Sequence, residues 1–115
     1  MQRRYRLRES KDFASLRQAG RVYHHHLILM SLLPNGLSHN RYGVITTKNL
    51  GKAVVRNRVR RLTREAVRLL HPRLHSGFDI VFVTRPGLID QPFGIVSHAV
   101  EELCCRAGIM VKNEP

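Results

Sequence analysis

The sequence predicts a small α/β sandwich whose elements follow the order αββαβα. Residues 53–70 place apolar side chains along one side of a helix. Residues 78–84, FDIVFVT, form a nearly continuous apolar strand bounded by turn residues. Two further β-like runs precede them, so we expect an α/β (α+β), two-layer sandwich in which helices pack on a small mixed sheet. At 115 residues and 43% hydrophobic content, residues 1–115 should form one domain with one core.

The N-terminal residues 1–9, MQRRYRLRE, carry four arginines and no packing period. We expect them to form a basic arm that is poorly ordered on its own. Ser10 can cap a short helix over residues 11–19, with Phe13 and Leu16 on one face. A helix this short is stable only when it packs against the rest of the fold.

Two strands are expected before the central helix. The run RVYHHHLILMSLL, residues 21–33, is β-like and is ended by turn residues from Pro34 onward. Residues 41–48, RYGVITTK, form the second strand, most simply paired antiparallel with the first across the intervening loop. The helix over residues 53–70 then ends because Pro72 disfavours helical backbone in the residue before it.

The strand over residues 78–84 is expected at the centre of the sheet, and a last helix follows it. Asp90 can cap this helix, so we expect it to span about residues 91–107, with Gly108 after its end. Residues 109–115 carry no structural signal and are expected to form a poorly ordered tail. The inner stripe of the last helix contains Val96, Ala99, Val100 and Leu103.

The central helix divides into an apolar face and a basic face. At about 100° per residue, the apolar side contains Val55, Val59, Leu62, Ala66, Leu69 and Leu70. The opposite side and its flanks contain Arg56, Asn57, Arg58, Arg60, Arg61, Arg64 and Arg68, and Lys48 and Lys52 lead into it. From Lys48 to Arg68, eight basic residues meet one acidic residue, Glu65. A row with this charge cannot be buried, so it faces solvent or an anionic partner.

The charge distribution favours a polyanionic partner. Lys52, Arg56 and Arg58 crowd the positive end of the helix dipole, at a cost of a few tenths up to about 1 kcal/mol each. The chain has a formal net charge of +12 and a pI near 11.2. Arginine suits bidentate contact with phosphate. We therefore infer nucleic acid, with a solvated face and an anionic membrane as alternatives, and the 6% aromatic content favours recognition by charge and shape.

Cysteine and hydropathy patterns bear on the compartment. Cys104 and Cys105 are adjacent, which excludes an ordinary structural disulfide between them, and no zinc-binding spacing occurs. We expect two reduced thiols. No apolar run approaches the roughly 18 residues of a membrane span, and no signal-type apolar segment follows the basic N-terminus. Neither membrane insertion nor secretion is supported, so a cytoplasmic location is expected.

The residues suggest neither an autonomous enzyme nor a metal site. His24, His25 and His26 could place two ligands on one face of a strand but lack a convincing third, so metal ligation is a minor alternative. The carboxylates are scattered, and neither a two-metal nuclease pattern nor a nucleophile motif occurs. A DNA-binding helix-turn-helix is disfavoured because a strand and Gly51, rather than a partner helix, precede the basic helix.

The motif RNRVRR at residues 56–61 carries a specific resemblance. With the preceding strand that ends in Thr-Lys and the segment Gly-Lys-Ala-Val, it resembles the signature of the bacterial ribonuclease P protein component. The resemblance includes the Asp12–Phe13 pair, the strand FDIVFVTRPG and the closing helix, and covers nearly all of residues 5–107. The main rival, a basic ribosomal or general RNA-binding protein, explains the charge but not the asparagine among the arginines.

The resemblance implies a protein subunit of a ribonucleoprotein endonuclease that removes 5′ leaders from precursor tRNA. The partners would be the catalytic ribonuclease P RNA and precursor tRNA, with no role for DNA or a membrane. The RNA subunit would perform the hydrolysis and would hold most of the Mg²⁺. The resemblance also implies a left-handed βαβ crossover, whereas the default hand is right-handed.

The resemblance assigns residues to two surfaces. Arg56, Asn57, Arg58, Arg60 and Arg61 match its RNA-contacting signature, Lys48 and Lys52 match basic positions before it, and Arg64 and Arg68 continue the same basic face. Phe13 matches an aromatic of a cleft that holds the single-stranded leader. Some relatives carry two further aromatics, at positions where this chain has Arg17 and, in the first strand, a residue near Met30. Phe13, Arg17 and Met30 are therefore the candidate leader contacts, and stacking would rest on Phe13.

Overall fold

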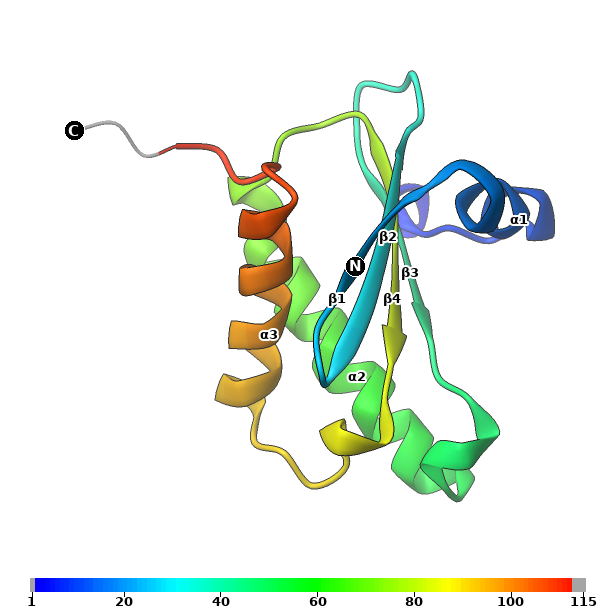
Figure 1. The fold of residues 1–115 in the computed structure, drawn as a ribbon, viewed down its shortest axis with the longest axis vertical. Helices are drawn as coiled ribbons and strands as arrows, with labels where there is room; N and C mark the ends of the chain where they lie inside the picture. Colours follow the sequence, from blue (N-terminus) through cyan, green and yellow to red (C-terminus); the bar gives the residue numbers. More distant parts are fainter. Residues whose placement is uncertain (1, 113–115) are drawn as a thin grey trace.

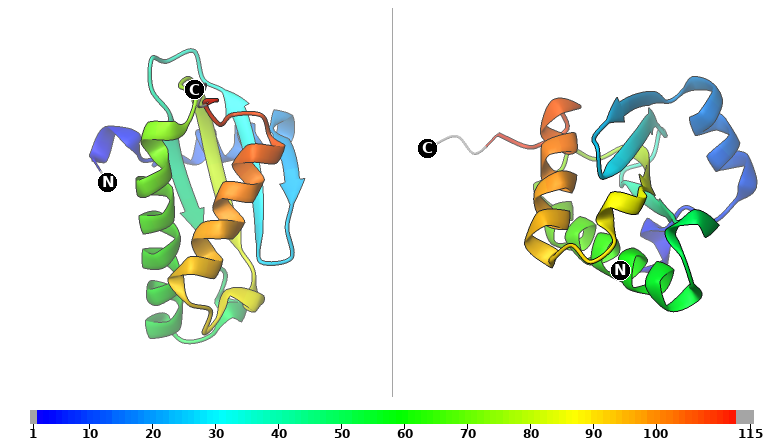
Figure 2. Two further views of the ribbon diagram at one scale, coloured as in Figure 1. Left: turned by 90° about the vertical axis from the view of Figure 1, so that its left-hand side faces the viewer. Right: turned by 60° about the horizontal axis from the view of Figure 1, so that its bottom comes forward.

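The chain forms a four-stranded mixed sheet with three α-helices, and the computed structural model describes residues 2–112 (Figure 1). The main elements are α1 (Ser10–Ala19), β1 (Arg21–His24), β2 (Ile28–Pro34), β3 (Arg41–Ile45), α2 (Ala53–Leu70), β4 (Phe78–Thr84) and α3 (Phe93–Arg106). The sheet order is β1-β2-β4-β3. Helices α2 and α3 cover one face, and α1 lies on the other (Figures 1 and 2). The predicted order αββαβα is confirmed, with the first predicted strand folded into a hairpin.

The hairpin of β1 and β2 replaces the single strand predicted over residues 21–33. The backbone N–H of His25 donates to the carbonyl oxygen of Ile28 at 3.0 Å, and the N–H of Leu27 donates to Nδ1 of His25 at 3.0 Å. The imidazole thus accepts a hydrogen bond inside the turn, as Asx and Ser/Thr side chains do in other turns. Because the run contains no Gly, Pro, Asn or Asp, the reversal left no turn signal in the sequence.

The predicted antiparallel pairing of residues 41–48 with residues 21–33 is wrong. Strand β4 lies between β2 and β3, antiparallel to β2 and parallel to β3. The parallel pair is joined by α2, which supplies the long crossover that parallel neighbours require. The hand of this crossover stays a prediction from the resemblance. The central place predicted for β4 is confirmed, and its apolar side chains fill both faces of the sheet.

The main core lies between the sheet and the layer of α2 and α3. Ile28, Met30 and Leu32 of β2 and Ile80 and Phe82 of β4 point into it, and each is at most 1% exposed. Burial of one such side chain contributes about 1.5–3 kcal/mol. The inner stripe predicted for α3 is confirmed, because Val96, Ala99, Val100 and Leu103 are all buried.

Helix α2 has the predicted bounds, but its buried face differs in part from the predicted one. Val59 and Leu70 are buried as expected. Leu69, which was placed on the apolar side, is 52% exposed, whereas Thr63 and Val67 are buried. Burial of Thr63 is tolerated because its hydroxyl donates to the Val59 carbonyl oxygen at 2.8 Å. At the edges of an apolar stripe, tertiary packing decides which side chains are buried. A helical wheel contains no information about that packing.

The opposite face of the sheet is only partly covered. Leu7, Leu16 and Val81 form a small buried cluster, and partly buried residues surround it. The segment before α1 reaches this cluster because the Leu7 N–H donates to the carbonyl oxygen of Tyr42 at 2.7 Å. Arg6 also pairs with Tyr42 as an isolated parallel bridge. Part of the basic arm therefore lies alongside β3, and its order in isolation stays a prediction.

Two helices begin differently from the predictions. Asp90 does not cap α3: its φ is 65°, and α3 begins at Phe93, directly after Pro92. Proline is favoured at a helix start because it has no backbone N–H to leave unpaired. Ser10 is the first residue of α1 rather than its cap, and Glu9 precedes it.

The C-terminal part of the chain is held to the fold as far as it is described. Met110 forms an isolated bridge with Leu74, and the Val111 N–H donates to the Arg73 carbonyl oxygen at 2.8 Å. Residues 113–115 of the predicted tail lie outside the described residues. Cys104 is buried and Cys105 is exposed, and both thiols are unpaired. Within residues 2–112, no helix has the length and apolar character to cross a membrane.

Candidate nucleic-acid interface

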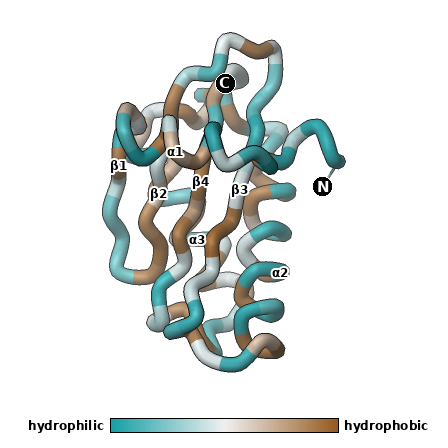
Figure 3. The backbone as a smooth tube through the Cα atoms, turned by 90° about the vertical axis from the view of Figure 1, so that its right-hand side faces the viewer, coloured by the Kyte–Doolittle hydropathy of each residue, from teal (hydrophilic) through white to brown (hydrophobic). Residues whose placement is uncertain are grey.

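Helix α2 carries the predicted basic face away from the sheet. Asn57, Arg61, Arg64 and Arg68 are exposed, and Arg56, Arg58 and Arg60 are half-buried. Lys48 lies in the short 3-10 helix η2 (Lys48–Leu50), and Lys52 is the N-cap residue of α2. Figure 3 shows the hydrophilic turns of α2 beside the apolar strands. The nine predicted positions therefore lie on one helix and its entry.

Hydrogen bonds orient part of this face. The Arg60 guanidinium donates to Thr46 Oγ1 at 2.6 Å and to Asn57 Oδ1 at 3.0 Å. Arg58 donates to the carbonyl oxygen of Gln91 at 3.3 Å and so links α2 to the loop before α3. Asn57 thus holds the Arg60 guanidinium in place. A lysine or arginine at this position could not do so, because neither side chain has a hydrogen-bond acceptor.

Acidic residues neutralise little of the face. Glu65 pairs with Arg68 at 2.6 Å, and the hydrogen bonds from Arg68 lower the pKa of the Glu65 carboxyl. Among the residues that the structure describes, Arg56, Arg61 and Arg64 form no ion pair. Arg61 and Arg64 line one groove together with Arg60, an arrangement that attracts an anion bearing several charges.

A second candidate surface lies beneath α1, on the partly covered face of the sheet. Phe13 is half-buried beside Gly43 of β3, and Arg17 is exposed one turn further along α1. Leu33, Ile45 and Val83 are partly buried and pack, like Phe13, against the small cluster of Leu7, Leu16 and Val81. The surface combines one accessible aromatic ring, an apolar floor and a positive charge, which are the features that single-stranded nucleic acid uses.

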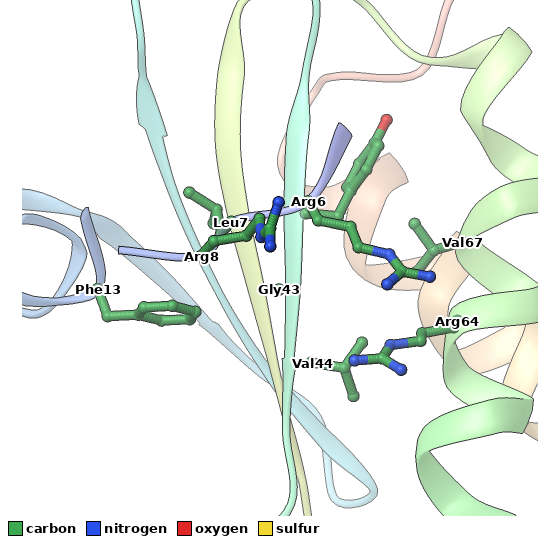
Figure 4. A pocket seen from close by; sticks show the side chains of 9 residues that line it. Arg6, Leu7, Arg8, Phe13, Gly43, Val44, Arg64 and Val67 are labelled. Atoms are coloured by element: carbon green, nitrogen blue, oxygen red, sulfur yellow. The ribbon is translucent and has the colours of Figure 1, made fainter. Parts of the chain in front are cut away.

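Two arginines of the basic arm join this surface without having been predicted individually. Arg6 and Arg8 line a cavity of about 250 Å³ together with Phe13, Gly43 and Arg64 (Figure 4). The sequence signal was the excess of arginine in residues 1–9, which gives charge but no position. Their placement depends on the bridge between the arm and β3.

Met30 is not part of this surface, and its prediction as a leader contact is wrong. Its side chain is 0% exposed and belongs to the main core. Side chains alternate along a strand, so the neighbours Leu29 and Ser31 face the side of α1 instead. Both are partly exposed. A shift of one residue along β2 therefore separates a core position from a surface position.

An ion-pair network ties α1 to the sheet. Arg41 of β3 donates to both carboxylate oxygens of Asp79, at 2.9 and 2.7 Å, and lies 3.5 Å from Asp12 of α1. Asp79 also accepts a hydrogen bond from Asn35 at 2.9 Å. The hydrogen bond to Asp79 is the main cause that raises the pKa of Arg41. In the sequence, a lone aspartate within an apolar strand indicates that Asp79 needs a partner. The sequence does not indicate that this partner is Arg41.

The side chains of residues 2–112 do not fit a Mg²⁺ ion held by this chain. Asp12 and Asp79 both engage Arg41, and the described residues contain no group of three or more His, Cys, Asp or Glu that could hold a metal. The histidine triplet does not converge either. His25 pairs with Glu102 at 3.0 Å and stacks on His26, while His24 ends β1.

Fold, charge and site define a basic α/β protein of the nucleic-acid-binding class. A family model described as Ribonuclease P matches residues 1–108. The chain belongs to the ribonuclease P protein component family and is a protein subunit of that endoribonuclease.

Individual relatives agree with this assignment. The Ribonuclease P protein component of Roseiflexus sp. (strain RS-1) is 40% identical over 115 residues, covering 99% of this chain and 94% of the relative. The RNase P protein from Thermotoga maritima has a TM-score of 0.81 at 28% identity, over 88% of this chain and 96% of that one. The Staphylococcus aureus RNase P protein, at 23% identity, shows the likeness of fold, with a TM-score of 0.85 over 92% of this chain and 97% of its own.

Proposed function

We propose that this chain assists the removal of 5′ leaders from precursor tRNA, and that the basic face of α2 binds the catalytic ribonuclease P RNA. The observation that carries the proposal is the row of arginines on α2, in which Arg68 alone forms an ion pair among the described residues. Guanidinium groups form bidentate, charge-assisted hydrogen bonds with phosphate. The hydrogen bonds among Arg60, Asn57 and Thr46 support a recognition role beyond charge.

We assign the leader of precursor tRNA to the surface beneath α1. Phe13 offers its ring to one base, and a base–aromatic stack is worth roughly 1–3 kcal/mol. Arg17 supplies charge to the adjoining backbone, and Leu29 and Ser31 replace Met30 as the residues of β2 on this surface. The partly covered sheet face supports this assignment, because Leu33, Ile45 and Val83 on that face are only partly buried.

Hydrolysis is assigned to the RNA subunit. Mg²⁺ bound by that RNA would supply an activated water, and this chain would bind and orient the substrate. The unpaired thiols of Cys104 and Cys105 support the proposed cytoplasmic location, because a reducing compartment keeps thiols in this state.

Recovery of RNA with the tagged protein tests the partner. We expect one structured RNA species that matches ribonuclease P RNA, and we expect less of it with Arg61→Ala. Arg73→Ala is the matched control, since Arg73 pairs with Glu101 at 3.6 Å and lies outside the α2 face. Recovery of bulk ribosomal RNA instead would point to a general RNA-binding protein.

Substitution of Phe13 tests the leader assignment. In the reconstituted holoenzyme, Phe13→Leu keeps apolar packing but removes the ring. We expect it to weaken binding of leader-bearing precursor roughly tenfold, with mature tRNA unaffected. An equal loss for both RNAs would show that Phe13 serves only the core.

A further inference from the structure

Two arginines from distant parts of the chain face each other across the edge of β3. Arg6 comes from the basic arm, which bridges to Tyr42 of β3, and Arg64 comes from the middle of α2. Figure 4 shows both guanidinium groups extending into the space between β3 and α2, near Val44 and Val67. The fold therefore brings two like charges together at a point that neither the arm nor the helix defines alone.

The described residues do not neutralise this pair. Both side chains are exposed, and within residues 2–112 neither forms an ion pair with a carboxylate. Partial burial is the main cause that lowers the pKa of Arg64, and the positive charges of Arg6 and Arg60 add to it. Like charges held at close range repel each other, and an anion placed between them removes that repulsion.

The pair stands where the two candidate surfaces meet. Arg6 and Arg64 line the cavity of about 250 Å³ that contains Phe13 and Gly43. They also line a groove of about 330 Å³ on the basic face of α2, which includes Asn57. A strand that leaves Phe13 and crosses the edge of β3 toward α2 therefore passes between these two guanidinium groups.

We propose that Arg6 and Arg64 clamp one phosphodiester of the precursor strand as it crosses from the surface beneath α1 to the basic face of α2. The proposal rests on the proposed function, because it extends the path of the leader. Each guanidinium can donate two parallel hydrogen bonds to phosphate oxygens. A phosphate of the catalytic RNA has the same chemistry, but the shared cavity with Phe13 favours the precursor.

A scan of neutral phosphates in the leader tests the clamp. The probes are precursor tRNAs with one methylphosphonate at each leader position in turn, and the readout is affinity for the reconstituted holoenzyme. With wild-type protein, we expect one position near the base on Phe13 to lower affinity roughly tenfold. With Arg6→Ala or Arg64→Ala, that position should cost less, because one of the two guanidinium partners is gone, and in the double variant it should cost nothing further.

Two comparisons sharpen the test. The double variant Arg6→Ala with Arg64→Ala should lose less affinity than the sum of the single losses, because both residues hold one phosphate. Arg3→Ala is the matched control from the same arm. It lines neither the cavity nor the groove and should keep the wild-type methylphosphonate profile.

Three results would overturn the clamp: a flat methylphosphonate profile in wild type, a sensitive position whose cost is undiminished in both single variants, or a loss confined to binding of catalytic RNA. The last result would assign the pair to the RNA subunit. Failure of the proposed function looks different, because the wild-type holoenzyme would then bind precursor and mature tRNA equally.

Discussion

The ring of Phe13 lies directly against the backbone of Gly43. A Cβ atom added at Gly43 would stand 2.9 Å from Cε1 and 3.1 Å from Cζ of that ring, closer than carbon atoms pack. The same Cβ would lie 3.5 Å from Cβ of Leu7. The missing side chain in β3 therefore sets the height of the ring above the sheet, and with it the depth of the proposed leader surface.

Gly43→Ala should displace the Phe13 ring and reduce the preference for leader-bearing precursor several-fold. Overpacking at such a site costs about 1–3 kcal/mol, and the ring can relieve it only by moving away. Affinities of the reconstituted holoenzyme for precursor and mature tRNA measure the effect. Gly94→Ala is the control, because its Cβ would meet nothing within 4 Å. A folded Gly43→Ala protein with unchanged preference would contradict this account.

The basic face of α2 should show separable contributions from charge and from Asn57. Arg61→Ala should make the slope of log affinity for catalytic RNA against log salt shallower by roughly 0.7–0.9, if Arg61 neutralises one phosphate. Asn57→Ala changes no charge, so affinity should fall while the slope is kept. Titrations over a range of salt, with circular dichroism to verify folding, distinguish the two. An Asn57→Ala protein that folds and binds normally would show that the basic face binds RNA through its charge alone.

Asp79→Ala should destabilise the fold by about 2–4 kcal/mol. Removal of one partner from a buried ion pair costs about 3–5 kcal/mol, and the Arg41 side chain retains 27% exposure, which moderates the cost. Urea unfolding measures the change. Glu65→Ala breaks the exposed pair with Arg68 and should cost much less. Equal losses in the two variants would argue against Asp79 as the anchor of this network.

Stability should fall as the pH drops below about 6.5. Burial is the main cause that lowers the pKa of His71, and the positive charge of Arg4 adds to it. Burial is also the main cause that lowers the pKa of His25. As the pH falls, the histidines of the unfolded chain therefore bind protons at a higher pH than those of the folded protein. The contribution of the neutral histidines to stability is fully present above about pH 6.5 and is lost as the pH falls toward their lowered pKa values in the folded state. His71 contacts the Tyr42 hydroxyl at 2.7 Å.

The check is urea unfolding at several pH values from neutral to mildly acidic. His71→Gln keeps a hydrogen-bonding side chain near Tyr42 but cannot titrate, so the stability of that variant should depend less on pH. An unchanged pH dependence in His71→Gln would remove His71 from the account.

The sequence was most informative where one periodicity ran without interruption. The helix over residues 53–70 and the strand over residues 78–84 have the predicted bounds, because their apolar patterns depend on local geometry alone. The turn at His25 was missed because a histidine side chain takes the role usually given to a turn residue. Strand pairing depends on where the chain returns to the sheet after α2, because β4 enters between β2 and β3, and this is a tertiary property.

The site divides in the same way. The basic face of α2 could be predicted because its members share a helix. The position of Met30 could not, because alternation along β2 depends on where the hairpin turns. Arg6 and Arg64 are separated by about half of the chain, so only the bridge between the arm and β3 reveals that they meet.

Reconstitution of cleavage tests the central claim most directly. Precursor tRNA is incubated with Mg²⁺ and with the purified protein alone, ribonuclease P RNA alone, or both. Release of the leader at the mature 5′ end is measured in each reaction. We predict no cleavage by the protein alone and faster cleavage, with a lower KM for precursor, when protein joins the RNA. RNA-free protein whose cleavage activity follows the protein peak on a column would contradict the account.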